Sequence, residues 1–297
     1  MEFSAKDDPT WARARDISRR MLDLPDQVQY LIRSGWGKKI SEDEFVKELT
    51  DGLTQPPGYF PKNVMMNIQG YDSIDDVLSR GLEALSVERF EELGNQDDVL
   101  VLDTRSAGDF VQGFIPGSMF IGVDGSFAVW VGTLIKDINQ KIVLVTDPGR
   151  EEEVITRLAR VGYDHAIGYL EGGFESWKNS GKSVDSIESI SAEEAYERIA
   201  QNEGKVLDVR KNSEYNSEHV KDAMNAPLDY IDASMEKVDK NDKYFVHCLG
   251  GYRSVIFSSI LKANGYNNLV DIKGGFRAIQ ESNKYDVTDY VCPTTML

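Results

Sequence analysis

The chain repeats one sequence pattern twice, and this internal repeat constrains the fold more than any other feature. The segment LDTRSAGDF, which starts at Leu102, returns at Leu207 as LDVRKNSEY, and EGGFESW returns later as KGGFRAI. In both copies short apolar runs alternate with helical stretches, a pattern typical of α/β domains. We therefore predict two copies of one α/β domain, each a mainly parallel sheet flanked by helices, over residues 82–183 and 184–297.

The first part of the chain, residues 1–81, lacks this alternation. Ser41 and Glu44 have the spacing of a helix capping box, which predicts a short helix over residues 41–53. Three prolines fall within residues 55–62. Because proline fixes φ and removes an N–H donor, regular structure is not expected there. We expect an amino-terminal helical and irregular segment.

Composition excludes several classes of protein. The net charge of −17 disfavours nucleic acid as a partner, because its phosphates would be repelled, and two cysteines are too few for a disulfide-stapled secreted scaffold. No apolar run approaches the ~20 residues of a membrane span, so the expected location is cytoplasmic, with no membrane partner. Three scattered histidines cannot converge into a catalytic metal centre. We expect neither a metal nor another cofactor.

A strand-to-helix loop in the second copy carries the candidate chemistry. Cys248 ends an apolar run, and a helix is predicted from Ser254 onward, so the residues between can curl their N–H groups around the sulfur. Gly250 and Gly251 permit the backbone angles of such a curl. N–H donors and a helix N-terminus stabilise a thiolate, which is the nucleophilic form of cysteine. Arg253 adds a fixed positive charge that can hold an anionic substrate.

This loop, Cys-x-x-Gly-x-Arg-Ser after an apolar strand, resembles the active-site loop of the rhodanese family of sulfurtransferases. Asp208-Val-Arg210 and Gly274-Gly-Phe276 match the family's flanking segments. The resemblance implies two rhodanese-like domains, in which Cys248 takes up a sulfane sulfur as a persulfide while Arg253 steadies the sulfur donor. The other residues implied are the persulfide-binding loop (Leu249, Gly250, Gly251, Tyr252 and Ser254) and the supporting pair Asp208 and Arg210.

Two other functions compete with sulfur transfer. Protein tyrosine phosphatases place five residues between cysteine and arginine, whereas four separate Cys248 from Arg253 here, and the narrower loop favours sulfur over phosphate. The alternative to an enzyme is a scaffold that positions a partner such as a persulfide-oxidising enzyme. The expected small-molecule partners are thiosulfate or a low-molecular-weight persulfide as sulfur donor, and a thiol or another nucleophile as acceptor.

The first copy has Asp147 where the second has its cysteine. The loop that follows reads as shortened, and residues 151–153 are three glutamates that would repel an anionic donor. We predict that this copy is catalytically silent and has a packing or positioning function. Binding of an anion by Arg105 and Arg150 is the alternative.

Residues 39–71 resemble the end of the metallo-β-lactamase-fold domain in persulfide dioxygenase–rhodanese fusion proteins. Those fusions carry an inactive and then an active rhodanese copy, in the order seen here. Their iron-binding cluster of His and Asp is absent from this chain. The resemblance implies an amino-terminal segment that cannot oxidise a persulfide by itself.

Two further residues have an open function. Cys292 is either a tail residue without a function or a resolving thiol that accepts sulfur from Cys248. His247 precedes the cysteine on the strand, so its side chain is expected on the opposite face. A structural function is favoured for His247 over that of a general base.

Overall fold

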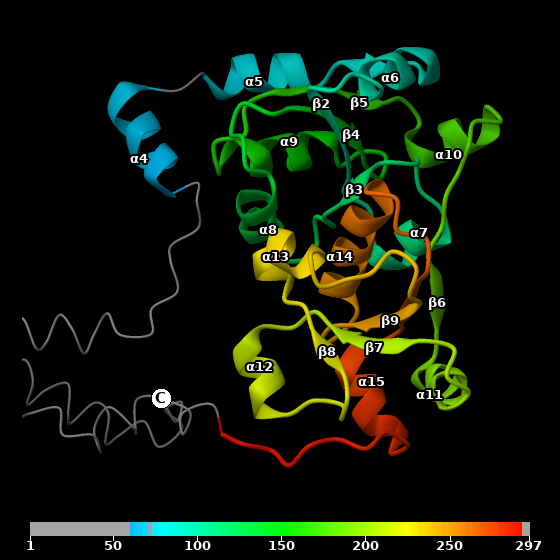
Figure 1. Cartoon of the computed structure of the whole chain (residues 1–297). Coiled ribbons are helices and arrows are strands. Elements are labelled where there is room, and N and C mark those ends of the chain that lie inside the picture. The colour runs from blue at the N-terminus through cyan, green and yellow to red at the C-terminus, as the bar shows by residue number, and fades with distance from the viewer. Residues whose placement is uncertain (1–59, 71–72, 293–297) are drawn as a thin grey trace, which may run out of the picture. The chain divides into compact units, whose positions relative to one another are not determined.

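The computed structural model describes residues 60–70 and 73–292 (Figure 1), so the helix predicted over 41–53 lies outside the described residues. Residues 57–290 form one compact unit, and Val291 and Cys292 belong with the other part of the chain. Among the described residues, no helix is long and apolar enough to cross a membrane.

The first copy forms a five-stranded parallel sheet in the order β1-β5-β4-β2-β3. The runs VLVLD and KIVLV are apolar along almost their whole length because helices cover both faces of such a sheet. The elements are β1 (Ala84–Leu85), α6 (Val87–Gly94), β2 (Val99–Asp103), α7 (Ala107–Gln112), β3 (Met119–Phe120), α8 (Phe127–Leu134), β4 (Lys141–Val145), α9 (Glu151–Ala159), β5 (Ala166–Leu170) and α10 (Gly173–Asn179).

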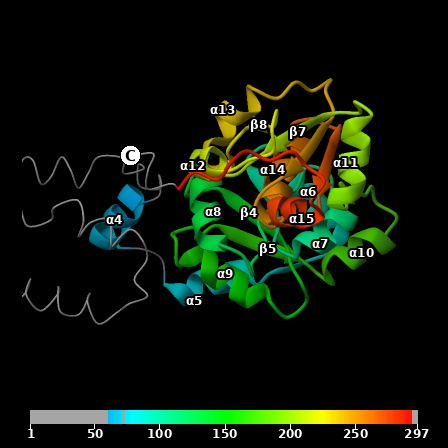
Figure 2. The same cartoon turned by 90° about the horizontal axis from the view of Figure 1, so that it is seen from below.

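The second copy repeats that topology, with strand order β6-β10-β9-β7-β8 and all pairs parallel. Helices α11 and α15 lie side by side on it (Figures 1 and 2). The elements are β6 (Glu188–Ile190), α11 (Ala192–Ala200), β7 (Lys205–Asp208), α12 (Asn212–Ser217), β8 (Met224–Asn225), η1 (Leu228–Tyr230), α13 (Ile231–Met235), β9 (Tyr244–His247), α14 (Tyr252–Ala263), β10 (Leu269–Ile272) and α15 (Gly275–Ser282). The predicted pair of α/β domains is confirmed.

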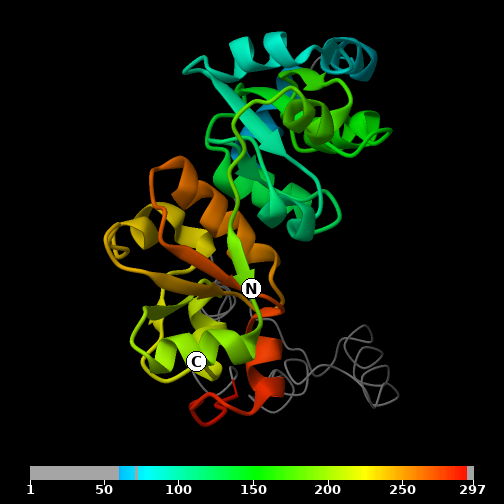
Figure 3. The same cartoon turned by 90° about the vertical axis from the view of Figure 1, so that its right-hand side faces the viewer.

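Helix α14 joins the two copies. This helix has no polar face, and it is buried on nearly all sides. One hydrophobic core cluster includes α14 and contains residues of both copies. The backbone N–H of Phe120 in β3 donates to Oγ of Ser259 in α14 at 3.0 Å. Figure 3 shows the first copy above the second, connected by the light green segment that enters β6.

Within the described part of the chain two further helices precede the first sheet, α4 (Phe60–Gln69) and α5 (Ile74–Gly81). Val77 of α5 is buried in the core, and a Cβ atom at Gly81 would lie 2.9 Å from Cδ1 of Ile155 in α9. Helix α5 therefore packs on the first copy, although it lies before residue 82, where we predict that the first domain begins.

The structure corrects three details of the loops. Helix α14 begins at Tyr252, two residues before the predicted start, because Gly251 is its N-cap. In the first copy Asp103 lies opposite Val145, just as Asp208 lies opposite His247 in the second, so Thr146, and not Asp147 as predicted, occupies the position of Cys248. Helix α9 begins at Glu151, five residues after Thr146, whereas α14 begins four residues after Cys248. The prediction that the first copy's loop is shortened is therefore wrong.

Candidate active site

The thiol of Cys248 lies where strand β9 ends and helix α14 begins. The backbone N–H of Gly251 donates to Sγ at 3.1 Å, and Gly251 has φ +95°, a left-handed conformation that favours glycine. The cysteine is only 2% exposed. An N–H donor and the positive end of a helix both favour negative charge on this sulfur.

The second glycine-rich segment holds the loop from the other side. At the start of α15, Phe276 donates its N–H to the carbonyl oxygen of Cys248 at 2.7 Å, and Arg277 donates to that of Leu249 at 3.2 Å. Gly275, with φ +62°, comes so close that a Cβ atom there would lie 2.4 Å from the Cys248 oxygen. The glycines of the motif KGGF therefore allow α15 to approach the backbone of the cysteine loop closely.

The pair Asp208 and Arg210 braces this arrangement from β7. Both side chains are buried, and Nε and Nη2 of Arg210 donate to the carboxylate of Asp208 at 2.6 to 3.0 Å. The guanidinium also donates to the Glu218 carbonyl at 2.8 Å and lies 3.9 Å from the centre of the Phe276 ring. Arg210 thus connects the end of β7 to α15 and has its charge fully engaged.

The first copy keeps the same brace without the cysteine. Arg105 bonds the buried Asp103 and lies 4.1 Å from the centre of the Phe174 ring. It also donates to the Gly113 carbonyl at 2.8 Å. Because the copy without the cysteine retains this pair, the pair is a feature of the fold that does not depend on the cysteine.

Arg253, the expected anion holder, is paired with Glu214 of α12. Its Nη1 and Nη2 donate to the two carboxylate oxygens at 2.6 and 2.8 Å, with 15% of the Arg253 side chain and 29% of the Glu214 side chain exposed. Burial lowers the pKa of Arg253, but hydrogen bonds and the charge of Glu214 outweigh burial, so that pKa lies above its usual value. Burial raises the pKa of Glu214, and Arg253 reverses the shift, so that pKa lies below its usual value. Both groups are therefore charged, and the two terminal nitrogens of the guanidinium already donate to Glu214.

Two side chains of the predicted persulfide loop point elsewhere. Oγ of Ser254 donates to Asp271 of β10 at 2.7 Å, and Asp271 also accepts from Ser189 at 2.9 Å. The hydroxyl of Tyr252 donates to the carbonyl of Gly122, in the first copy, at 2.7 Å. These contacts fix the first turn of α14, on which the Gly251 donor depends.

The ring of His247 is buried within the domain. It stacks on Phe276 with ring centres 5.9 Å apart, and its Nε2 lies 3.8 Å from Oδ2 of Asp208. Burial lowers the pKa of His247, so the ring is neutral near neutral pH. These contacts are those of a packing residue.

In the corresponding loop of the first copy, the arginine side chain is occupied by ion pairs. Arg150, the N-cap of α9, bonds both carboxylate oxygens of Asp124 at 2.7 and 2.8 Å and Glu153 at 2.8 Å. These hydrogen bonds raise the pKa of Arg150. With Arg105 held by Asp103, both arginines considered for anion binding have carboxylate partners.

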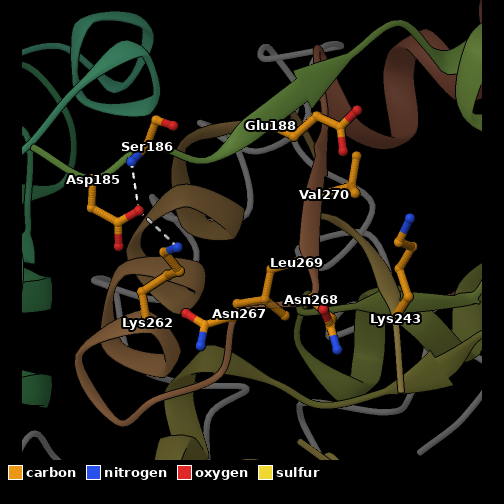
Figure 4. A pocket seen from close by; sticks show the side chains of 9 residues that line it. All are labelled: Asp185, Ser186, Glu188, Lys243, Lys262, Asn267, Asn268, Leu269 and Val270. Atoms are coloured by element: carbon orange, nitrogen blue, oxygen red, sulfur yellow. Dashed lines mark hydrogen bonds and ion pairs between the residues drawn. The ribbon is translucent and has the colours of Figure 1, made fainter. Parts of the chain in front are cut away.

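An open hollow of about 320 Å³ lies at the other end of the second sheet (Figure 4). It adjoins the amino ends of β6 and β10, whereas Cys248 follows the carboxyl end of β9, where ligands of α/β sheets bind. Lys262 pairs with Asp185 across the hollow at 2.9 Å. The hollow therefore lies away from the cysteine loop.

Among residues 60–70 and 73–292, no group of three His, Cys, Asp or Glu side chains is placed to hold a metal ion. Sequence reasoning missed Glu214, Asp271 and Gly122. None of the three carried a signal in the sequence, because Lys211 cannot act as the acceptor of a capping box, although Glu214 does accept the Lys211 backbone N–H at 3.2 Å.

The chain belongs to the family of rhodanese-like domains. The family model matches residues 86–180 and 191–282, which together make up more than half of the chain. Both copies, the one with Cys248 and the one with Asp147, are therefore rhodanese-like domains.

The chain also resembles named proteins. It is 24% identical over 153 residues to YrkF of Bacillus subtilis, which is named as a candidate sulfur carrier protein, covering 48% of this chain and 83% of that one. It is 30% identical over 106 residues to a tRNA uridine(34) hydroxylase of Chlamydia trachomatis, covering 32% of each. A thiosulfate sulfurtransferase structure from Pseudomonas aeruginosa matches with 18% identity and a TM-score of 0.33, covering 71% of this chain and 44% of that one.

Residues 39–71, with their resemblance to a metallo-β-lactamase-fold domain, fall mostly outside the described residues. The family match begins only at residue 86. That resemblance therefore stays a prediction.

Proposed function

We propose that the second rhodanese-like domain is a sulfurtransferase that carries sulfane sulfur as a persulfide on Cys248. The observation that carries this proposal is the cysteine loop itself: Sγ receives the Gly251 N–H at 3.1 Å at the start of α14. The donor is thiosulfate or a low-molecular-weight persulfide, and the acceptor is a thiol.

The reaction has two displacement steps and needs no oxidant. The Cys248 thiolate attacks the outer sulfur of the donor, the S–S bond of the donor breaks, and sulfite or a thiolate leaves with the bonding electron pair. An acceptor thiolate then attacks the terminal sulfur of the persulfide, and Cys248 leaves as a thiolate. The Gly251 N–H and the helix N-terminus stabilise the anionic sulfur before and after each step.

The test against phosphatase chemistry compares two substrates on the wild-type chain. We expect thiosulfate-to-thiol transfer that is readily measured. Hydrolysis of an aryl phosphate should be at least about a hundredfold slower, because the four-residue spacing between Cys248 and Arg253 makes a loop too narrow to orient a phosphate. Comparable rates on the two substrates would overturn the assignment.

Glu214 should restrain the donor-binding strength of Arg253. Glu214→Gln keeps the shape and one acceptor oxygen but removes the charge, so the KM for thiosulfate should fall about three- to tenfold. Steady-state kinetics measure this, with Glu281→Gln, an exposed acid on α15, as the matched control. An unchanged or higher KM in Glu214→Gln, with the control unchanged, would contradict it.

Cys292 remains the candidate resolving thiol. In that case Cys292→Ser slows transfer of sulfur from Cys248 to the acceptor severalfold and leaves loading by the donor unchanged. Single-turnover discharge of a preloaded chain measures both steps. Unchanged discharge would remove Cys292 from the reaction.

A further inference from the structure

The side chain of Tyr252 leaves the cysteine loop and enters the first copy. Its hydroxyl donates to the Gly122 carbonyl at 2.7 Å, and its ring lies edge-on to Phe120 with ring centres 5.9 Å apart. Burial raises the pKa of Tyr252, so the hydroxyl keeps the proton it donates. Tyr252 directly follows Gly251, the N–H donor to Cys248, so a displacement of Tyr252 reaches that donor through one peptide bond.

Residues 121–126, between β3 and α8, form the seat of this ring. A Cβ atom at Gly125 would lie 2.2 Å from Cζ of Tyr252, and one at Gly122 would lie 3.2 Å from Cε2. The φ angle of Gly125 is not in the left-handed region, so the ring alone excludes a larger residue there. The seat is therefore built with no spare room for a side chain.

The loop between β4 and α9 in the first copy, together with α9, supports this seat through two arginines. Arg150 bonds both carboxylate oxygens of Asp124 at 2.7 and 2.8 Å, and Arg157 of α9 donates to the Val123 carbonyl at 2.8 Å. Asp124 and Val123 both belong to the seat. The loop that lacks a nucleophile thus contacts the segment on which the active loop's tyrosine rests.

We infer that Tyr252 is a positioning residue and that the first copy's loop, through Arg150 and residues 121–126, fixes the Gly251 donor against Cys248. The silent copy therefore tunes the reactivity of the other copy's thiol. The inference rests on the proposed function in taking Cys248 as the reactive thiol. Its test does not require sulfur transfer.

The experiment adds one methyl group to the seat. In a Cys292→Ser background, so that only Cys248 reacts, the alkylation rate by iodoacetamide is measured across pH for Gly125→Ala. We expect the alkylation rate of Cys248 near neutral pH to fall by about tenfold or more relative to the chain with Gly125. The pH profile of that rate should move to higher pH. The matched control is Gly108→Ala, in α7 of the same copy, where a Cβ atom meets nothing closer than 3.7 Å.

A double-mutant cycle separates positioning from general damage. In a Tyr252→Ala background, adding Gly125→Ala should change neither the rate nor the profile, because the ring it strikes is gone. An equal loss in both backgrounds would overturn the inference, as would a Gly125→Ala profile identical to that of Gly108→Ala.

Two variants add no bulk and cover the case in which Gly125→Ala fails to fold. Tyr252→Phe removes only the hydrogen bond to Gly122, and Arg150→Ala removes the support of Asp124 together with the ion pair to Glu153. Both should move the alkylation profile in the same direction by a smaller amount, and wild-type profiles in both would overturn the inference. Shifted alkylation profiles in a chain that accepts no sulfur would refute the proposed function and would still support the positioning of Gly251 by the seat.

Discussion

Replacing Cys248 with serine should abolish sulfur transfer while leaving the fold intact. A hydroxyl at this position is a far weaker nucleophile than a thiolate, so thiosulfate-to-thiol turnover should fall at least about a thousandfold. Serine is close to cysteine in size, and its oxygen can still accept the Gly251 N–H, so thermal unfolding should be nearly unchanged.

The other cysteine supplies the matched control for that experiment. Cys292→Ser removes a thiol from the same chain and should retain full loading by the donor. Turnover that survives in Cys248→Ser would place the reactive group elsewhere. Loss of loading in Cys292→Ser as well would contradict the assignment of Cys248 as the first acceptor.

The second large effect is on stability. Asp208→Ala leaves the guanidinium of Arg210 buried beside an aromatic ring without its carboxylate, so the free energy of unfolding should fall by about 3–5 kcal/mol. Urea denaturation measures this loss. Asp286→Ala, which breaks an exposed pair with Lys221, is the control and should leave stability nearly unchanged.

The first copy offers a sharper comparison for the same pair. Asp103→Ala breaks the equivalent buried pair with Arg105, so it should cost a similar free energy. Similar losses at Asp103 and Asp208 would support a purely structural function for both pairs. A loss at Asp208 alone, or none at either, would contradict the view that this pair braces the fold.

The sequence repeat was sufficient to predict the fold, because each motif depends on contacts within its own copy. The buried arginine of LDTR and LDVR and the glycines of GGF recur in both copies, and both copies use them in the same way. The paired apolar runs likewise became the central parallel strands. A motif that occurs in both copies therefore predicts the contacts that form within each copy.

Contacts between the copies could not be predicted, because no local pattern encodes them. Nothing in the sequence around Gly122 or Gly125 marks them as the seat of Tyr252, 127 or more residues away. The pairing of Arg253 with Glu214 likewise depends on how the fold places α12 relative to the start of α14. The prediction of a shortened loop was wrong because the sequence does not show that α9 begins only after Arg150, which is its N-cap as Gly251 is that of α14.

The most direct test of sulfur transfer is the intact mass of the chain after incubation with thiosulfate or glutathione persulfide. The account predicts that the wild-type chain gains one sulfur atom, about 32 Da, which a reductant removes, and that Cys248→Ala gains none. No added mass on the wild-type chain from any donor, or the same gain on Cys248→Ala, would contradict the account. The first of these results would favour a scaffold function.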